Sequence, residues 1–132
     1  MTKPLAAAFT LIAAFLLPSP ALSIGETCTP KIGWPDLPTE LRSHIVSAVG
    51  GEVSPSDGPF NSTDVVRDST PQSRFFGACR DGSEWRVAVE RGGRGHHLQV
   101  LVFSGGALSD TWRSGIPSGA FDRAVLYRDN GR

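Results

Sequence analysis

The fold is decided by residues 84–104, which read EWRVAVERGGRGHHLQVLVFS. Apolar and polar side chains alternate over residues 84–91, a pattern typical of a strand with one buried face. The apolar side of this segment carries Trp85, Val87 and Val89. A second apolar run covers residues 96–104, after the glycine-rich residues 92–95. Two strands joined by a short glycine-rich segment predict an antiparallel hairpin.

Alternate residues of a strand lie on the same face of the sheet, so the pattern predicts which side chains of the second strand are buried. We expect its buried face, shared with Trp85, to carry Leu98, Val100 and Val102. The opposite face is expected to carry Arg86, Glu90, Gln99, Leu101 and Phe103. A register error of one residue would exchange these two sets.

Further strands are expected on both sides of the hairpin. Residues 73–79 form one, ending at the Asp-Gly turn of residues 80–83. Residues 52–59 are expected to form a loop, and residues 60–67 to form another strand. Residues 108–114, which follow Gly105-Gly106, have a weaker strand pattern. Residues 120–128 fit either a last strand or a short helix.

One helix precedes the strands, behind a proline-rich extended segment. Leu37, Leu41, Ile45 and Val49 recur every four residues and form one apolar stripe. We expect Asp36 or Thr39 to cap the start of a helix that runs to about Val49, where Gly50-Gly51 provides a left-handed stop. The predicted class is α+β: an antiparallel meander of about four to five strands, with one N-terminal helix packed on one face.

Residues 1–23 follow the plan of a cleavable signal peptide. Lys3 precedes an apolar run over residues 5–17, and Ala21-Leu22-Ser23 supplies small residues for a peptidase. The run is too short to span a bilayer, and a buried N-terminal helix is the alternative. We expect residues 24–132 to form a single domain in the periplasm or medium, with no membrane insertion after cleavage.

The chain has two cysteines, Cys28 and Cys79. In an oxidising compartment such a pair predicts a disulfide, and two free buried thiols are the alternative. The bond would close a loop of about 50 residues, worth roughly 4 kcal/mol in the chain-entropy model. Cys79 shares parity with Phe75, so we expect it on the face that the helix covers.

Charge and motifs exclude several function classes. Lysine plus arginine and aspartate plus glutamate each number 13, and cleavage removes Lys3. A nucleic-acid-binding domain is normally strongly basic, so no nucleic-acid partner is expected. The sequence contains no cofactor motif, no G-x-S-x-G motif and no metal-ligand spacing such as H-x-x-x-H, so no cofactor and no metal are expected.

The densest polar cluster is residues 90–97. Arg91 and Arg94 carry forked donors suited to carboxylates or phosphates. His96 and His97 are adjacent on a strand, so they point to opposite faces and do not chelate one ion together. The cluster is either a projecting recognition loop or a flexible turn whose glycines serve only the turn.

Aromatic residues outside the core supply further candidates. Trp112 lies in a weak strand between charged residues, and Trp34 lies in the proline-rich segment. Each is either an exposed anchor for a partner or a cover for a sheet edge. A metal site built from His44, His96 and His97 is a less favoured alternative.

These observations favour a small exported binding protein without enzymatic activity. The leading hypothesis is an inhibitor or immunity protein that occludes a periplasmic, cell-wall-degrading enzyme through Arg91, Arg94, His96, His97 and Trp112. The first alternative is a module that binds a small ligand or a cell-wall fragment on the sheet face that carries Arg86, Gln99 and Phe103. A small secreted hydrolase is the second alternative. A concave pocket would favour a ligand, and a protruding loop would favour an inhibitor.

Overall fold

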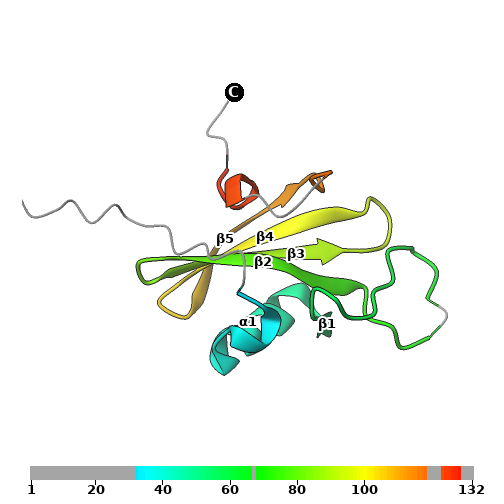
Figure 1. The fold of residues 1–132 in the computed structure, drawn as a ribbon, viewed down its shortest axis with the longest axis horizontal. Helices are drawn as coiled ribbons and strands as arrows, with labels where there is room; N and C mark the ends of the chain where they lie inside the picture. Colours follow the sequence, from blue (N-terminus) through cyan, green and yellow to red (C-terminus); the bar gives the residue numbers. More distant parts are fainter. Residues whose placement is uncertain (1–31, 67, 119–122, 129–132) are drawn as a thin grey trace, which may run out of the picture.

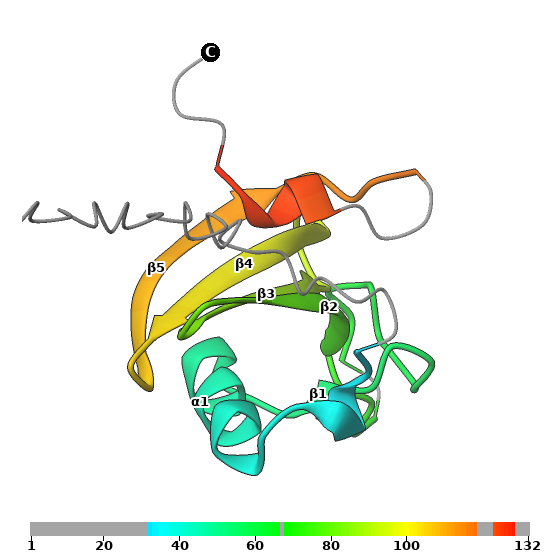
Figure 2. The same cartoon turned by 60° about the vertical axis from the view of Figure 1, so that its left-hand side comes forward.

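The computed structural model describes residues 32–66, 68–118 and 123–128, which form a curved five-stranded sheet with helical elements on both faces (Figures 1 and 2). In chain order the elements are η1 (Trp34–Asp36), α1 (Thr39–Val49), β1 (Val53–Ser54), β2 (Ser73–Asp81), β3 (Glu84–Arg91), β4 (His97–Ser104), β5 (Ala107–Ser114) and η2 (Arg123–Leu126). The predicted signal peptide, residues 1–23, and Cys28 lie outside the described residues.

The strands lie in the order β1-β2-β3-β4-β5, and β2 to β5 form the antiparallel meander that the sequence predicts. The α+β class is therefore confirmed. A purely antiparallel sheet is wrong, because β1 pairs with β2 in parallel, with Val53 opposite Ser73. The segment between them brings the chain back to the same end of the sheet, so the two strands run in the same direction.

The strand predicted over residues 60–67 is also wrong. The described residues of this segment form turns and bends, and β1 lies earlier, where a loop was expected. The reason is local: the Asn61 side chain donates to the Val65 carbonyl at 2.9 Å and accepts from the Thr63 amide at 3.0 Å. Short polar side chains that bond the nearby backbone compete with a strand ladder.

Helix α1 begins at Thr39 and ends at Val49, as predicted, but the predicted cap is wrong, because the N-cap residue is Pro38 and no side chain caps the helix. Gly50 follows with a φ of +75°, and its amide donates to the Val46 carbonyl at 3.0 Å. This is the left-handed stop that a glycine adopts without steric cost. The preceding segment is not fully extended, because Trp34–Asp36 makes a 3-10 turn. Trp34 is half-buried against Phe75, with ring centroids 5.8 Å apart, so it covers the core and is not an exposed anchor.

Two apolar clusters lie on opposite faces of the sheet. The larger lies under α1 and comprises Leu37, Leu41, Ile45, Val49, Val53, Phe75, Ala78, Val87, Val89, Leu101 and Phe103. The smaller lies under η2 and comprises Cys79, Ala88, Val100 and Leu126, with Phe76, Trp112 and Val125 packed against it. Figure 2 shows α1 and η2 on the two sides of the sheet. Helical cover on both faces explains why both sides of β4 are apolar.

The predicted faces of β4 are wrong. Trp85 lies opposite Phe103, and Val87 lies opposite Leu101, so these residues share the α1 face. Val100 belongs to the other cluster, and Gln99, opposite Val89, lies on the α1 face. The hairpin connection is one residue longer than expected, because β4 begins at His97 and not at His96. That single residue exchanges the two faces.

Cys79 also lies on the face opposite to the predicted one. An irregularity in pairing between Phe75 and Gly77 leaves Phe76 as an extra residue, as in a β-bulge. Beyond it Ala78 packs under α1, and Cys79, 1% exposed, packs in the cluster under η2. The pairing of Cys79 with Cys28 stays a prediction, since Cys28 lies outside the described residues.

The segment predicted as a strand or a short helix contains η2 within its described part. Leu126 is fully buried, and its carbonyl accepts a hydrogen bond from Arg86 Nη1 at 3.0 Å. The Arg86 guanidinium also lies 4.5 Å from the centre of the Tyr127 ring. The C-terminal part of the chain is thereby anchored to the face opposite α1.

Candidate partner-binding site

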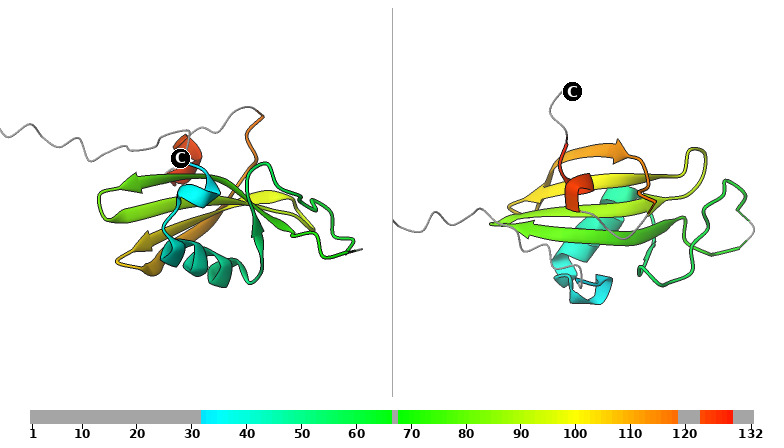
Figure 3. Two further views of the ribbon diagram at one scale, coloured as in Figure 1. Left: turned by 60° about the horizontal axis from the view of Figure 1, so that its bottom comes forward. Right: turned by 45° about the horizontal axis from the view of Figure 1, so that its top comes forward.

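The β3–β4 hairpin projects from one end of the sheet, next to the segment that joins β1 to β2 (Figures 1 and 3). Two hydrogen bonds join them: the Gly92 amide donates to the Gln72 carbonyl at 2.8 Å, and the Gly93 amide donates to the Ser62 carbonyl at 3.1 Å. We call this pair the loop–hairpin contact. A Cβ on Gly92 would lie 3.0 Å from both the Asn61 carbonyl carbon and Ser62 Cα, and closer still to the Asn61 oxygen. Gly92 therefore permits a close approach of two backbones.

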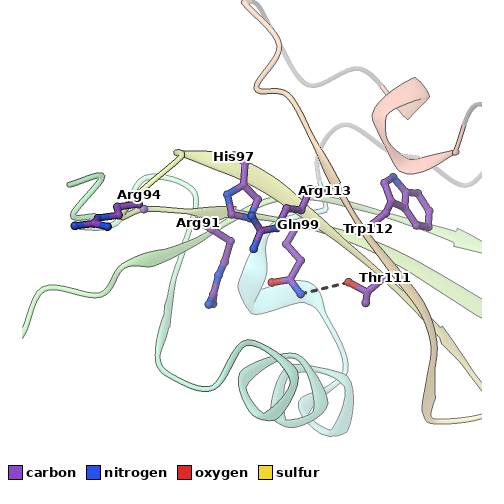
Figure 4. A pocket seen from close by; sticks show the side chains of 8 residues that line it. Arg91, Arg94, His97, Gln99, Thr111, Trp112 and Arg113 are labelled. Carbon is purple, nitrogen blue, oxygen red and sulfur yellow. Dashed lines mark hydrogen bonds between the residues drawn. The ribbon is translucent and has the colours of Figure 1, made fainter. Parts of the chain in front are cut away.

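A pocket of about 440 Å³ opens beside this hairpin. Its position follows from the strand register, which places Arg91 opposite His97 and Gln99 opposite Arg113 on the α1 face of the sheet. We call it the basic pocket, and its lining residues, seen in Figure 4, are Arg91, Gly92, Arg94, His97, Gln99, Thr111, Trp112 and Arg113.

Arg91 and Arg113 dominate the electrostatics of the basic pocket. Arg91 Nη1 donates to the Val49 carbonyl at 2.9 Å and to Ser73 Oγ at 2.7 Å, so its partners are neutral. Partial burial, and secondarily the like charge of Arg113, lower the pKa of Arg91 below the ordinary arginine range. Among the residues that the structure describes, neither guanidinium has a carboxylate within 4.0 Å. The pocket therefore holds two positive charges without a counterion from the described chain.

The other polar groups extend this donor set. Gln99 Nε2 donates to Thr111 Oγ1 at 3.3 Å, which fixes the orientation of the amide on the pocket floor (Figure 4). His97 projects into the same space (Figure 4). Arg94 lies at the outer rim, 94% exposed, with its Nε 3.7 Å from Asp64 Oδ2. An exposed pair at that distance contributes little to stability, so Arg94 stays accessible to an anion.

His96 lies in the hairpin connection, just before β4, and contacts Glu90 on the face of the sheet opposite Arg91. Its Nε2 lies 2.7 Å from Glu90 Oε1, while Arg74 donates to Glu90 Oε2 at 2.8 Å and 3.0 Å. The Glu90 side chain is only 7% exposed. Phe60 covers the group, with its ring centre 4.6 Å from the Arg74 guanidinium. Here His96 has a structural contact that the sequence did not reveal, and it lies apart from the basic pocket.

Trp112 contributes to the wall of the basic pocket, but its ring points away from the arginines (Figure 4). The ring packs against the cluster under η2, and the Arg128 guanidinium lies 5.0 Å from its centre. Trp112 is half-buried in the edge strand β5, and its role as a partner-binding residue stays a prediction.

The structure thus brings together Arg91, Arg94 and His97, which the sequence singled out for a partner, and Gln99, which it placed on the alternative ligand-binding face. Thr111 and Arg113, which it did not place in a site, join them. Thr111 and Arg113 alternate with Trp112 along the predicted strand 108–114, so parity places them together on the face opposite the tryptophan. That signal was available. The sequence did not reveal the register of β4, which places Thr111 and Arg113 on the same face of the sheet as Arg91.

The three histidines lie in different environments. His44 lies on α1, 3.8 Å from Glu40 Oε1, while His96 contacts Glu90 and His97 lines the basic pocket. Within residues 32–66, 68–118 and 123–128, no group of three His, Cys, Asp or Glu side chains is placed to hold a metal ion.

The fold and the site together define a class: a small α+β domain with a basic polar pocket at one end of its sheet. Comparison with known proteins gives no matching family model, no matching curated sequence and no matching solved structure. None of the helices in the described part of the chain is long and apolar enough to cross a membrane.

Proposed function

We propose that this chain is an exported binding protein without enzymatic activity, which inhibits a cell-envelope enzyme by holding its carboxylates in the basic pocket. The observation that carries the proposal is the pairing of the half-buried Arg91 with the exposed Arg113, which repel each other and have no carboxylate within 4.0 Å among the described residues. Arginine pairs are suited to planar, bidentate recognition of carboxylates. Destabilising charge of this kind is a common mark of a functional site.

The lining of the basic pocket favours a side chain of a protein partner over a free small molecule. Small-molecule sites are mostly apolar, with a few polar groups that fix orientation. This pocket is lined by Arg, His, Gln and Thr, and the Trp112 ring points away from it. A carboxylate presented by a partner needs charge and hydrogen bonds here, and the surrounding interface supplies the apolar contact.

Cell-wall-degrading enzymes fit this chemistry. Enzymes that cleave glycosidic bonds use a pair of Asp or Glu side chains in a cleft. A projecting hairpin with Arg94 at its rim could enter such a cleft, and the loop–hairpin contact supports the rigidity that an inhibitor requires.

Export belongs to the same proposal and rests on the sequence alone. Its support is the charged start, apolar run and small-residue cleavage site of residues 1–23. The disulfide between Cys28 and Cys79 is likewise proposed, because exported cysteine pairs are normally oxidised.

The experiment is an inhibition assay with purified peptidoglycan-cleaving glycosidases, amidases and endopeptidases acting on cell-wall suspensions. The mature protein should inhibit at least one glycosidase. Arg113→Ala should raise the inhibition constant about 30-fold, equivalent to a hot-spot loss of about 2 kcal/mol. Arg42→Ala is the matched control, since Arg42 lies on α1 and donates to Thr39 Oγ1. Full activity of every enzyme at saturating protein would refute the inhibitor function.

A small anionic ligand is the second candidate, favoured by the concave shape of the basic pocket. Titration calorimetry with glutarate and with inorganic phosphate tests it directly. Micromolar binding of either anion that Arg113→Ala abolishes, without any enzyme inhibition, would establish this alternative.

A further inference from the structure

We propose that Val65 and Val66, at the tip of the loop beside the hairpin, form a second anchor that inserts into an apolar socket on a protein partner. The inference deepens the proposed function and rests on it, since it assigns the partner a second kind of contact. We call residues 61–66 the 61–66 loop.

The tip exposes more apolar surface than a solvated loop requires. Val65 is 50% exposed and Val66 is 71% exposed. The other large apolar residues exposed in the described chain, Leu108 and Tyr127, are separate from each other in sequence and less exposed. Single exposed apolar residues are normal, but Val65 and Val66 are consecutive in the chain, and both are at least half exposed.

The 61–66 loop is held in one conformation by its own side chains. Asn61 Nδ2 donates to the Val65 carbonyl at 2.9 Å, and Asn61 Oδ1 accepts from the amide and the hydroxyl of Thr63 at 3.0 Å and 2.7 Å. Gln72 Nε2 donates to the Thr63 carbonyl at 2.9 Å. A loop ordered before binding loses less conformational entropy when it docks, so an exposed apolar tip on it is an efficient anchor.

The tip and the basic pocket belong to one surface. The Gly93 amide donates to the Ser62 carbonyl at 3.1 Å, and Arg94 Nε lies 3.7 Å from Asp64 Oδ2. Arg94 lines the basic pocket, so a partner whose carboxylate enters the pocket also faces the residues next to Val65. Figures 1 and 3 show the loop and the hairpin at the same end of the molecule.

Charge around the tip indicates the kind of partner. The arginines of the basic pocket favour a partner with carboxylates beside its socket. Asp64 and Asp68 flank the valines, and hydrogen bonds from Thr70 keep the pKa of the Asp68 carboxyl below its ordinary value. The charges next to the valines in sequence, Asp64, Arg67 and Asp68, sum to −1, which disfavours an anionic lipid surface because such a surface attracts clusters of Lys and Arg. The chemistry therefore fits a protein with an apolar socket for the valines and with carboxylates on the side that faces the basic pocket.

The test uses a phage-displayed library of random cyclic peptides panned on the immobilised mature protein. Enriched peptides should combine apolar residues with Asp or Glu. Their affinity should fall about tenfold or more for the double variant Val65→Ser, Val66→Ser, as for loss of an interface anchor. Leu108→Ser, which removes an exposed apolar side chain from β5, is the matched control and should bind as the native protein does.

A further variant tests the ordering of the loop. Asn61→Ala keeps both valines but removes the side-chain bonds that fix the tip, and it should lower peptide affinity by about threefold to tenfold, the entropic cost of ordering a few side chains. Matching thermal melts of the valine variant and the native protein would show that the fold is intact, since both valines are exposed.

Several outcomes would overturn the inference. These are peptides that bind the double serine variant as tightly as the native protein, a library that yields no binder, and self-association of the native protein that the variant abolishes. The last would assign the tip to a second copy of the chain. If peptides require the valines while no enzyme is inhibited, the proposal that Val65 and Val66 form an anchor is supported and the inhibitor function is refuted. If an enzyme is inhibited equally by the native protein and the valine variant, the proposed anchor is refuted and the inhibitor function is supported.

Discussion

Replacement of Gly92 by alanine tests the architecture of the binding end, since an added Cβ has no room there. It would lie 3.0 Å from both the Asn61 carbonyl carbon and Ser62 Cα, and these are backbone atoms that cannot rotate away. The chain must separate at this point, and the hydrogen bonds from Gly92 to Gln72 and from Gly93 to Ser62 are then lost or stretched. At about 1 kcal/mol for each bond, the free energy of unfolding should fall by about 2 kcal/mol. For a domain of this size the melting temperature should fall by roughly 10 °C.

Urea denaturation gives the free energy of unfolding, and hydrogen exchange at the Gly93 amide reports on the loop–hairpin contact itself. Gly115→Ala is the matched control, because a Cβ there has nothing within 4 Å and the backbone is not left-handed. The Gly92 variant should exchange its Gly93 amide much faster, while the Gly115 variant stays within about 0.5 kcal/mol of the native protein. Equal stability of the two variants would refute the close approach at Gly92.

The remaining predictions concern buried charge, the basic pocket and the disulfide. Glu90→Ala removes the 7% exposed carboxylate that contacts both Arg74 and His96, so urea denaturation should show a loss of about 3 kcal/mol; a loss below 1 kcal/mol would contradict its structural role. Arg113→Ala relieves the repulsion of Arg91 and should raise the free energy of unfolding by about 0.3 kcal/mol after solvent screening, less in high salt; a loss of stability would refute the uncompensated pair. The exported protein should have a mass two hydrogens below the reduced chain, and Cys79→Ser should lower the free energy of unfolding by about 2–5 kcal/mol. A full-length, thiol-reactive product would contradict the export and the bond to Cys28 alike.

The sequence predicted those elements whose signal is local. Residues 84–90 place Trp85, Val87 and Val89 on one face, with Ala88 the one apolar residue on the other, and the strand has the predicted bounds. Helix α1 is similarly determined by a four-residue apolar period and by Gly50, whose left-handed conformation ends it. In both cases neighbouring residues contain all the information that the element requires.

The register of β4 could not be predicted in the same way. The apolar residues 100–103 leave no polar position to mark a face, because helical elements cover both sides of the sheet. The face then depends on the length of the hairpin connection. His96 belongs to that connection and not to the strand, because its ring contacts Glu90 and Phe60. These contacts depend on a loop that is distant in sequence, so local patterning does not reveal them.

The candidate site was predicted in part for the same reason. Arg91, Arg94 and His97 are close in sequence and were found as a cluster, whereas Arg113 comes from β5 and joins them only through the register of β4. The error in β4 therefore removed the residue on which the electrostatic argument depends. A site formed across three strands is visible in sequence only as far as the register is known.

The hairpin divides two kinds of charge between two faces, and this division links its stability to its proposed function. Glu90 and Arg91 are neighbours in β3, so they point to opposite faces. Glu90 is paired with Arg74 and His96, and this compensated group lies where Phe60 joins the loop to the sheet. Arg91 shares its face with Arg113 and has no carboxylate partner in the described chain. The charge of Glu90, beside the 61–66 loop, is neutralised within the protein. The charges of Arg91 and Arg113, in the basic pocket, are available to a carboxylate of another molecule. A partner carboxylate would therefore strengthen binding without competing with the contacts that keep the binding end in place.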